Sequence, residues 1–231
     1  MNIAIIPARG GSKGIKNKNI LKIAGKPLIV WSIEHALQSK SVDAVFVTTD
    51  DAEILEIAQK AGAKVIKRPK ELANDTATSE SALLHALDSI EKEYSIVPKN
   101  IVFLQATSPV REAYDIDRAF KVYQEQELDS LFSCCKVEDR FVWEKDENRY
   151  KSVSYDHENR RRRQDVTPRF LENGSIYIFK YNILRLDNNR LGGKIGVYEM
   201  PIWKSFQIDK PEDIEICEYY LEKMRKNEKH L

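Results

Sequence analysis

Cysteine is scarce in this sequence, with three residues among 231, namely Cys134, Cys135 and Cys217. Two of them are adjacent and the third is distant, so the spacing of a zinc site, such as CxxC or a Cys/His pattern, is absent. Three unpaired thiols are typical of a protein kept in a reducing cytosol. We therefore expect a fold that depends on neither disulfides nor a structural metal.

Long apolar runs are also missing, and none approaches the ~20 residues that a membrane span requires. The apolar start, residues 1–6, stops at Pro7 and Arg9 and lacks the basic region of a signal peptide. The formal net charge is only +1, which gives no bulk electrostatic argument for nucleic acid or a membrane as partner. The sequence predicts a cytoplasmic protein that binds small molecules.

Short β-branched runs alternate with longer amphipathic stretches through the first half of the chain. Strands are expected at 3–6, 44–49, 63–66 and 101–104, and helices at 27–39, 51–61, 79–93 and 114–126. This βαβαβα order predicts an α/β fold with a mostly parallel central sheet and right-handed crossovers.

The pattern changes after residue 130. Further strands are expected at 130–137, 175–179, 195–200 and 205–208, and a final helix at 211–226. Residues 138–167 are polar and irregular, which is long for a loop in a compact domain. We expect one domain over residues 1–231, with 138–170 as a functional loop or an interface arm.

The first motif, PARGGSKG at residues 7–14, follows the first strand. Its glycines let backbone N–H groups approach phosphates, and Arg9 and Lys13 add positive charge, with Lys18 and Asn19 close behind. Neither the GK[ST] ending of a Walker A loop nor a GxGxxG fingerprint is present. The motif predicts a triphosphate site; the alternative is a glycine-rich turn with solvated cations.

One further block leads into an expected helix, and another follows an expected strand. In LANDTATS, residues 72–79, Thr78 or Ser79 can cap the following helix or contact a nucleotide. In LQATSPVR, residues 104–111, Gln105 and Thr107 stand at the carboxyl end of a central strand, where open α/β sheets bind ligands. The alternative for the second block is an ordinary strand-to-helix turn that ends at Pro109.

Two blocks lie in the last third of the chain. NGSIYIF, residues 173–179, is a core strand in which only Asn173 and Tyr177 suggest function. The last block runs from Phe206 to Asp213 and places Asp209 at a strand end, where an aspartate commonly binds Mg²⁺ or caps a helix.

With all five blocks in this order, the sequence resembles the acylneuraminate cytidylyltransferases, the CMP-sialic acid synthetases, over Ile3 to about Glu222. Related members of that family activate legionaminic or pseudaminic acid. The resemblance implies a three-layer, Rossmann-like nucleotidyltransferase fold. It also implies a homodimer in which the 138–170 arm reaches the partner's active site.

The resemblance assigns roles residue by residue. It implies catalytic roles for Arg9, Lys13, Lys18 and Asp209. Nucleotide binding falls to Ala8, Arg9, Gly11, Ser12, Asn19 and Ser79. Sugar binding falls to Gln105, Thr107, Arg163 and Tyr177. A divalent metal, Mg²⁺ or Mn²⁺, would be held by Asp209 and Gln207. Members of the family carry an aspartate where this chain has Gln207, whose amide oxygen can bind magnesium but adds no charge.

The implied reaction joins CMP from CTP to the anomeric hydroxyl of a nine-carbon 2-keto acidic sugar and releases pyrophosphate. Two alternatives stay open. One is a nucleotidyltransferase that uses UTP or GTP with a sugar phosphate. The other is a non-catalytic nucleotide-binding regulator, which Gln207 favours. The sequence indicates neither which acidic sugar is used nor a general base.

Overall fold

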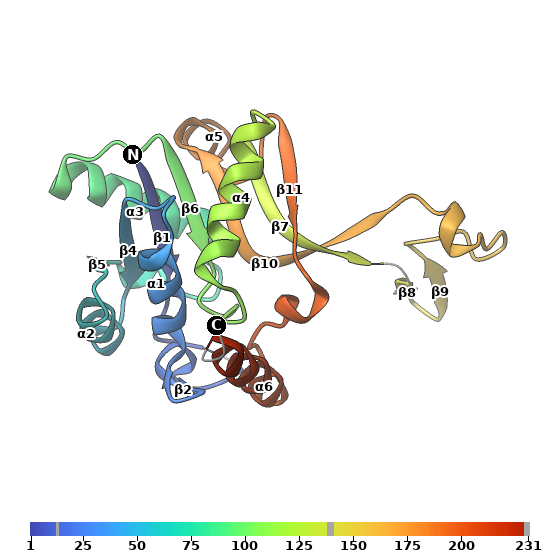
Figure 1. Ribbon diagram of the computed structural model, residues 1–231, viewed down its shortest axis with the longest axis horizontal. Coiled ribbons are helices and arrows are strands. Elements are labelled where there is room, and N and C mark those ends of the chain that lie inside the picture. Colours follow the sequence, from blue (N-terminus) through green and yellow to red (C-terminus); the bar gives the residue numbers. More distant parts are fainter. Residues whose placement is uncertain (13, 138–140, 229–231) are drawn as a thin grey trace.

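A seven-stranded sheet forms the centre of the chain (Figure 1). The computed structural model describes residues 1–12, 14–137 and 141–228, without the side chains of residues 163, 227 and 228. The strand order is β11-β7-β10-β6-β1-β4-β5. In chain order these strands are β1 (Asn2–Pro7), β4 (Ala44–Thr49), β5 (Lys64–Lys67), β6 (Asn100–Leu104), β7 (Ser130–Val137), β10 (Arg169–Lys180) and β11 (Ile195–Glu199).

Most neighbouring strands of this sheet run parallel. β1 pairs in parallel with β4 and with β6, β4 pairs with β5, and β11 pairs with β7. Only β10 runs antiparallel, between β6 and β7. The predicted mostly parallel sheet is therefore confirmed. The carboxyl ends of β1, β4, β5 and β6 meet at one edge, which is where ligands bind in such sheets.

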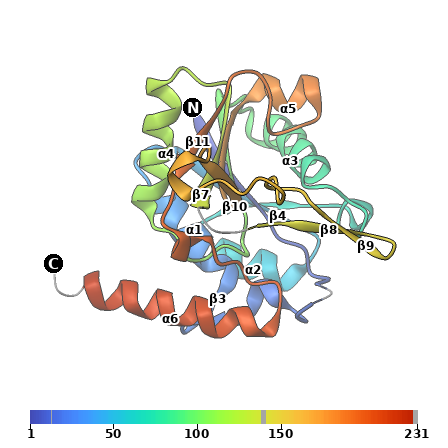
Figure 2. The same cartoon turned by 90° about the vertical axis from the view of Figure 1, so that its right-hand side faces the viewer.

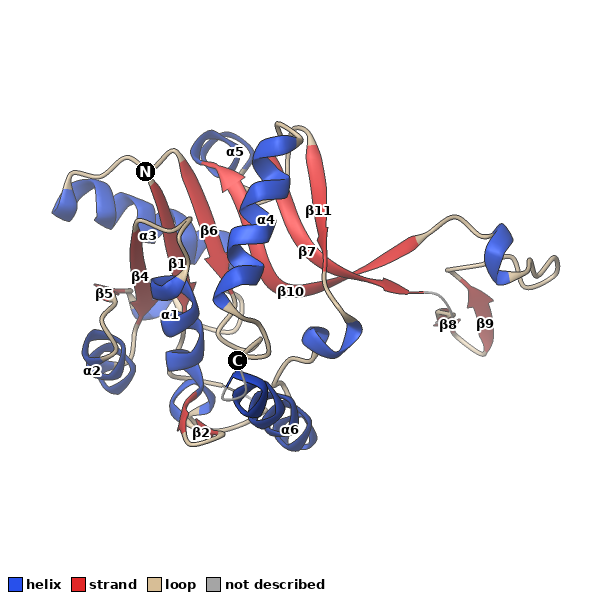
Figure 3. Cartoon of the chain, in the orientation of Figure 1, coloured by secondary structure: helices blue, strands red, loops and turns tan. Residues whose placement is uncertain are grey.

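Helices cover both faces of the sheet (Figures 2 and 3). Ala4 and Ile6 of β1 pack in one apolar cluster with α1 (Leu28–Gln38), α2 (Ala52–Lys60) and α4 (Ala113–Glu125). Ile3 and Ile5 point the other way, into a cluster with α3 (Ser79–Tyr94) and α5 (Tyr181–Asp187). This alternation along a strand builds the expected three layers. No helix in the described part of the chain is long and apolar enough to cross a membrane.

The last helix, α6 (Pro211–Glu228), packs beside the start of α1 rather than on the sheet. It contributes Cys217 and Leu221 to a third apolar cluster, together with Leu28 and Ile208. Asp213, in the first turn of α6, accepts hydrogen bonds from the backbone N–H groups of Asp209 and Lys210. These contacts fix the segment that precedes the helix.

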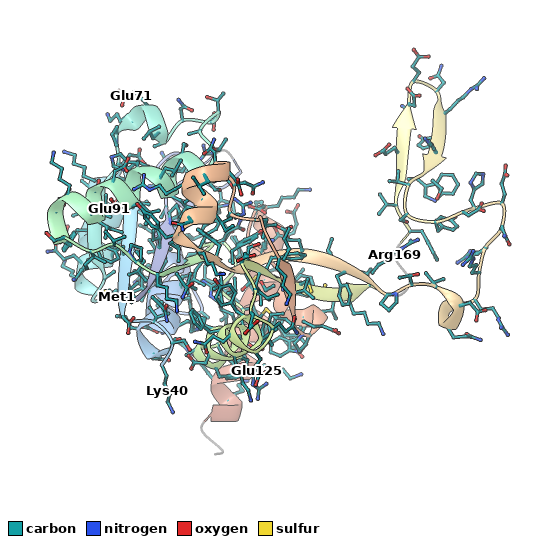
Figure 4. The ribbon with its side chains drawn as sticks, turned by 90° about the horizontal axis from the view of Figure 1, so that it is seen from above. Met1, Lys40, Glu71, Glu91, Glu125 and Arg169 are labelled. Atoms are coloured by element: carbon teal, nitrogen blue, oxygen red, sulfur yellow. The ribbon has the colours of Figure 1, made fainter. Side chains whose placement is uncertain are left out.

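An arm extends from the far ends of β7 and β10 (Figures 1 and 4). It carries a hairpin of β8 (Trp143–Asp146) and β9 (Arg149–Ser152), followed by the short helix η3 (Arg163–Asp165). Figure 4 shows Arg169 where β10 leaves the arm for the sheet. The irregular stretch expected from the sequence thus contains a hairpin of its own, paired from Trp143 to Ser152.

The strand expected at 205–208 is wrong. A short helix, η4 (Ile202–Ser205), occupies the start of this range, and no strand is assigned to residues 206–208. The apolar residues of this segment pack against α6 instead of a sheet, since Trp203, Phe206 and Ile208 belong to the third apolar cluster. The sequence also gave no indication of α5, whose seven residues are too few to show a helical period.

Candidate functional site

A cavity of about 440 Å³ opens at the carboxyl ends of β1 and β6. It gathers residues from four separate segments of the chain: the first loop, the start of α3, the end of β6 with the turn after it, and the segment before α6. Its lining consists of Pro7, Arg9, Ser12, Gly14, Lys18, Asn19, Ser79, Phe103, Gln105, Ala106, Thr107, Gln207 and Asp209.

A second cavity, of about 300 Å³, adjoins the first, since Pro7, Arg9 and Ser79 line both. Its other walls are the end of β5 and the loop that leads into α3. These walls carry Arg68, Leu72, Ala73, Asn74, Asp75, Ala77, Thr78 and Ala82. Volumes of this order are typical of sites for small ligands.

Arg9 stands between the two cavities. One of its guanidinium nitrogens lies 3.0 Å from the backbone oxygen of Asn74 and 3.1 Å from a carboxylate oxygen of Asp75. Its own backbone oxygen accepts a 2.9 Å hydrogen bond from the side chain of buried Asn19. The first loop is thereby held with one cation facing both cavities.

Lys18 and Asp209 form an ion pair on the wall of the larger cavity. Lys18 Nζ lies 2.9 Å from Asp209 Oδ1, and the lysine side chain is 13% exposed whereas the aspartate side chain is 64% exposed. A Cβ on Gly14 would lie 2.4 Å from the backbone oxygen of Asp209, so glycine is required where the loop passes this segment. The first and last motifs thus meet in space.

Two glutamine amides flank Gly174 on the opposite side of the cavity. Gly174 has a φ of +65°, and a Cβ there would lie 2.6 Å from Gln105 Oε1 and 2.8 Å from Gln207 Nε2. Gln207 Nε2 also donates a 2.9 Å hydrogen bond to the backbone oxygen of Asn173. The amide oxygen of Gln207, which this bond does not use, is the atom that can bind a cation.

Fully buried Arg111 holds the turn that carries Gln105 and Thr107. Its guanidinium donates to the backbone oxygens of Ser108 at 2.8 Å and of Ser175 at 3.0 Å, and to the Ser32 hydroxyl. Burial lowers the pKa of Arg111 to about 9, so the side chain remains a cation at neutral pH. These hydrogen bonds therefore fix the turn after β6 to its neighbours β10 and α1.

The choice between Thr78 and Ser79 as helix cap is resolved by geometry. Thr78 is the N-cap of α3, and its hydroxyl accepts a 3.1 Å hydrogen bond from the backbone N–H of Ser81. Ser79 is the first residue of the helix and lines both cavities. Ser79 thus lies at the helix N-terminus, where anions are favoured, on the wall of both cavities.

Three residues assigned from the sequence, Ala8, Gly11 and Tyr177, are not among the described residues that line the larger cavity. Ala8 is buried in the core, Gly11 is exposed, and Tyr177 is buried behind Phe103, with the two ring centroids 5.3 Å apart. Lys13 lies outside the described residues. Arg163 begins η3 in the arm, and its side chain is not described. The binding roles of all five stay predictions.

Sequence reasoning missed Arg68 and Phe103. Arg68 is buried, and within the described residues its Nε has no hydrogen-bond partner. Burial lowers the pKa of Arg68; the charge of Asp50 opposes this shift, and the neighbouring Arg9 adds to it. The available signal was position: Arg68 directly follows β5 at the same carboxyl edge as Arg9 and Gln105.

Two known proteins are similar in sequence over most of this chain. The chain is 35% identical to N-acylneuraminate cytidylyltransferase of Oncorhynchus mykiss over 93% of its length, and it spans about half, 49%, of that relative. It is 32% identical to post-translational flagellin modification protein B of Campylobacter coli, covering 95% of this chain and 94% of the relative.

Among solved structures, CMP:2-keto-3-deoxy-manno-octonic acid synthetase in complex with CTP has the same fold. Its TM-score is 0.70 at 20% identity, covering 96% of this chain and 99% of that one. The sequence model of the cytidylyltransferase family matches residues 3–230. The chain therefore belongs to the cytidylyltransferase family.

Proposed function

We propose that this protein transfers CMP from CTP to the anomeric hydroxyl of a nine-carbon 2-keto acidic sugar of the sialic, legionaminic or pseudaminic acid type, releasing pyrophosphate. The observation that carries the proposal is the meeting of Arg9, Lys18 and Asp209 in one cavity beside Gln105. The name of one similar protein, N-acylneuraminate cytidylyltransferase, supports the same reaction type and an acidic sugar as acceptor.

The triphosphate fits the side of the cavity formed by the first loop. Arg9, Lys18 and the hydroxyl of Ser12 line this side, and two of them are cations. Charge-assisted contacts of this kind bind phosphate oxygens and stabilise the negative charge that grows on a leaving pyrophosphate. In this proposal Lys18 exchanges its contact with Asp209 for a phosphate oxygen.

The cytidine fits the second cavity. Arg68 provides buried N–H donors there, and Ser79 provides a hydroxyl at its boundary with the first cavity. A cytosine presents a carbonyl oxygen and a ring nitrogen as acceptors, which suit the N–H donors of a guanidinium. The nucleoside would then place its α-phosphate near Arg9, where the two cavities meet.

The acceptor fits between Gln105, Thr107 and Phe103, on the other side of the larger cavity. Its hydroxyl oxygen attacks the α-phosphorus, the new O–P bond forms as the bond to the pyrophosphate oxygen breaks, and the hydroxyl proton passes to solvent. No covalent enzyme intermediate is required, since phosphoryl-type transfer depends on positioning and charge neutralisation.

The residues present fit a magnesium ion bound together with substrate. Within the described residues, no group of three His, Cys, Asp or Glu side chains could hold a metal without substrate. Asp209 and the amide oxygen of Gln207 provide one charged and one neutral oxygen, and magnesium is commonly held by one or two carboxylates plus phosphates. When bound there, the ion would neutralise phosphate charge and lower the pKa of the attacking hydroxyl.

We also propose that the protein is a homodimer joined through the 138–170 arm. The arm exposes large apolar side chains that its own chain does not cover, among them Phe141, Val142, Trp143 and Tyr150. It also extends away from the layered body of its own chain (Figure 1). Arg163 could therefore act at a sugar site only if that site belonged to a partner subunit.

The test is pyrophosphate release from CTP with magnesium, run in parallel with N-acetylneuraminic, diacetyllegionaminic and pseudaminic acids. Release with one sugar supports the proposal and identifies the acceptor. UTP and GTP with a sugar 1-phosphate form the comparison arm. Turnover only in that arm would replace the proposal by a sugar-phosphate nucleotidyltransferase, and CTP binding without turnover in any arm would favour a regulator.

A further inference from the structure

Arg190, in the loop after α5, makes three contacts that join separate parts of the fold. Its Nη1 lies 2.6 Å from the Glu80 carboxylate. Its guanidinium carbon lies 4.6 Å from the ring centroid of Tyr177 and 5.4 Å from that of Phe103. The side chains of Arg190 and Glu80 are only 20% and 19% exposed, so the ion pair is largely withdrawn from water.

Both groups that Arg190 contacts, the aromatic pair and Glu80, are next to residues that line the candidate site or include one. Phe103 lines the larger cavity two residues before Gln105, and its ring stacks on Tyr177 at an interplanar angle of 17°. Glu80 directly follows Ser79, which lines both cavities. The hydroxyl of Tyr177 is also held in place, because it donates a hydrogen bond to the Glu172 carboxylate.

We propose that Arg190 is a positioning residue that holds the Phe103–Tyr177 stack and the start of α3 in one fixed arrangement, and so sets the width of the acceptor side of the cavity. The inference rests on the proposed function. Arg190 acts through Phe103 and Ser79, because it is not itself among the residues that line either cavity.

An arginine suits this place better than a lysine. Its planar guanidinium can lie over aromatic faces and still donate to a carboxylate, whereas an ammonium is a point charge without a face. A cation over aromatic rings contributes most when it is withdrawn from water, as here. Loss of Arg190 would leave the Phe103 ring free to move and Glu80 without its partner.

The same stretch of chain offers a matched control. Arg185 also pairs with carboxylates of α3, at 2.6 Å from Asp88 and 2.6 Å from Glu91, and it also lies over a tyrosine ring, that of Tyr181 at 5.2 Å. These contacts fall in the later turns of α3, whereas Ser79 begins that helix. Neither cavity is lined by any of these residues.

The experiment measures KM for the acceptor acid, KM for CTP, kcat and melting temperature in wild type and in Arg190→Ala, Arg190→Lys, Glu80→Gln and Arg185→Ala. For Arg190→Ala we expect KM for the acceptor to rise roughly 5- to 30-fold, with kcat within about twofold of wild type. For Arg190→Lys we expect a KM for the acceptor between those of wild type and Arg190→Ala. Arg185→Ala should lower the melting temperature without changing either KM.

Two results would overturn the inference: an unchanged acceptor KM in Arg190→Ala, or an equal rise in Arg185→Ala. If Arg190→Ala does not fold, Arg190→Lys carries the test, and a wild-type KM in that variant counts against the inference. Absence of pyrophosphate release from the wild-type protein is a different result, because it overturns the proposed function and this inference with it.

Discussion

At the scale of single residues, the candidate site contains two ion pairs among its described residues, each between one cation and one carboxylate. Lys18 is mostly enclosed and meets Asp209, which faces the cavity with most of its carboxylate exposed. Arg9 meets Asp75 in the same way at the boundary of the second cavity. Each cation has a carboxylate near it before any ligand arrives, so binding of a triphosphate requires these pairs to rearrange.

Asp209→Ala should lower turnover at saturating CTP roughly 100- to 1000-fold, the cost typical of removing a charged contact made mainly in the transition state. The expected cause is the loss of Asp209 as the one carboxylate among the described residues that line the larger cavity. Pyrophosphate release is the measurement. Glu212→Gln is the control, because it removes a charge from an exposed position three residues later. Near-normal turnover in Asp209→Ala would remove the role proposed for this residue.

Protonation of His35 should make the protein less stable in mild acid. Burial, with the charges of Arg111, Lys26 and Lys204 adding to it, holds the pKa of His35 well below 6.5. The unfolded chain therefore takes up a proton below pH 6.5 that the folded chain does not, and stability falls as the pH falls. The expected loss between pH 7.5 and 5.5 is about 1.4 kcal/mol.

Urea unfolding at both pH values measures this loss. His35→Gln cannot titrate, so its stability should change less than that of wild type over the same interval. An equal acid loss in the two proteins would show that other groups account for it.

At the scale of secondary structure, the sequence was most informative where the pattern was long and periodic. The strands and helices before residue 130 lie within a few residues of their expected bounds, because each helix shows a full apolar stripe and each strand a buried run. The segment 205–208 was misjudged because alternation of polar and apolar residues cannot show that the partner is a helix rather than a strand.

The site was predictable to a similar degree. Arg9, Lys18, Gln105 and Asp209 could be singled out, since glycine-rich loops and strand ends leave a visible pattern and the family resemblance gave their roles. Arg68 had a signal in its position directly after a strand, whereas Arg190 could not be singled out, because its place depends on which elements lie side by side. A lone arginine between ordinary residues carries no sign of an aromatic stack or a buried pair.

The buried ion group around Lys204 should hold η4 against α4. Lys204 Nζ lies 2.6 Å from Asp115 and 2.5 Å from Glu112, and the side chains of Lys204 and Asp115 are each 2% exposed. Lys204→Met would leave two carboxylates without their cation. Removing one partner of a buried pair typically costs about 3–5 kcal/mol, and we expect a loss of this size.

Urea unfolding measures that cost. Lys121→Met is the control, because Lys121 pairs with Glu125 at 3.7 Å on the surface of the same helix. An exposed pair of this kind contributes about 1 kcal/mol at most. Equal losses in the two variants would contradict a structural role for the Lys204 group.

At the scale of the whole molecule, the described chain consists of a layered body and an arm that leaves it (Figure 1). The body holds the cavities and its apolar clusters. The arm contributes to none of these clusters, and its aromatic rings pack mainly on each other, as Phe141 does on Tyr155. An element with so little support from its own body is expected to gain it from a second copy.

Sedimentation at micromolar concentration should therefore show a dimer, and Phe170→Asp should convert it to a monomer. Phe170 is 43% exposed in the part of β10 that leads into the arm. A carboxylate there would have to be withdrawn from water in the proposed interface. Leu186→Asp, on α5, is the control, because Leu186 is 82% exposed and should leave the dimer intact. A wild-type monomer would remove the dimer proposal.

The ion pair between Lys18 and Asp209 has a consequence for how the protein is made. The two residues are 191 positions apart in the chain. During synthesis at about 5–20 residues per second, the cationic loop emerges roughly 10–40 s before its carboxylate. Gln105 is made near the middle of that interval, so the first loop and β1 exist beside Gln105 for only about its second half, without the residues that close the site. In the proposed function, the cations that bind phosphate are therefore made early in synthesis, whereas Asp209 is added only just before α6.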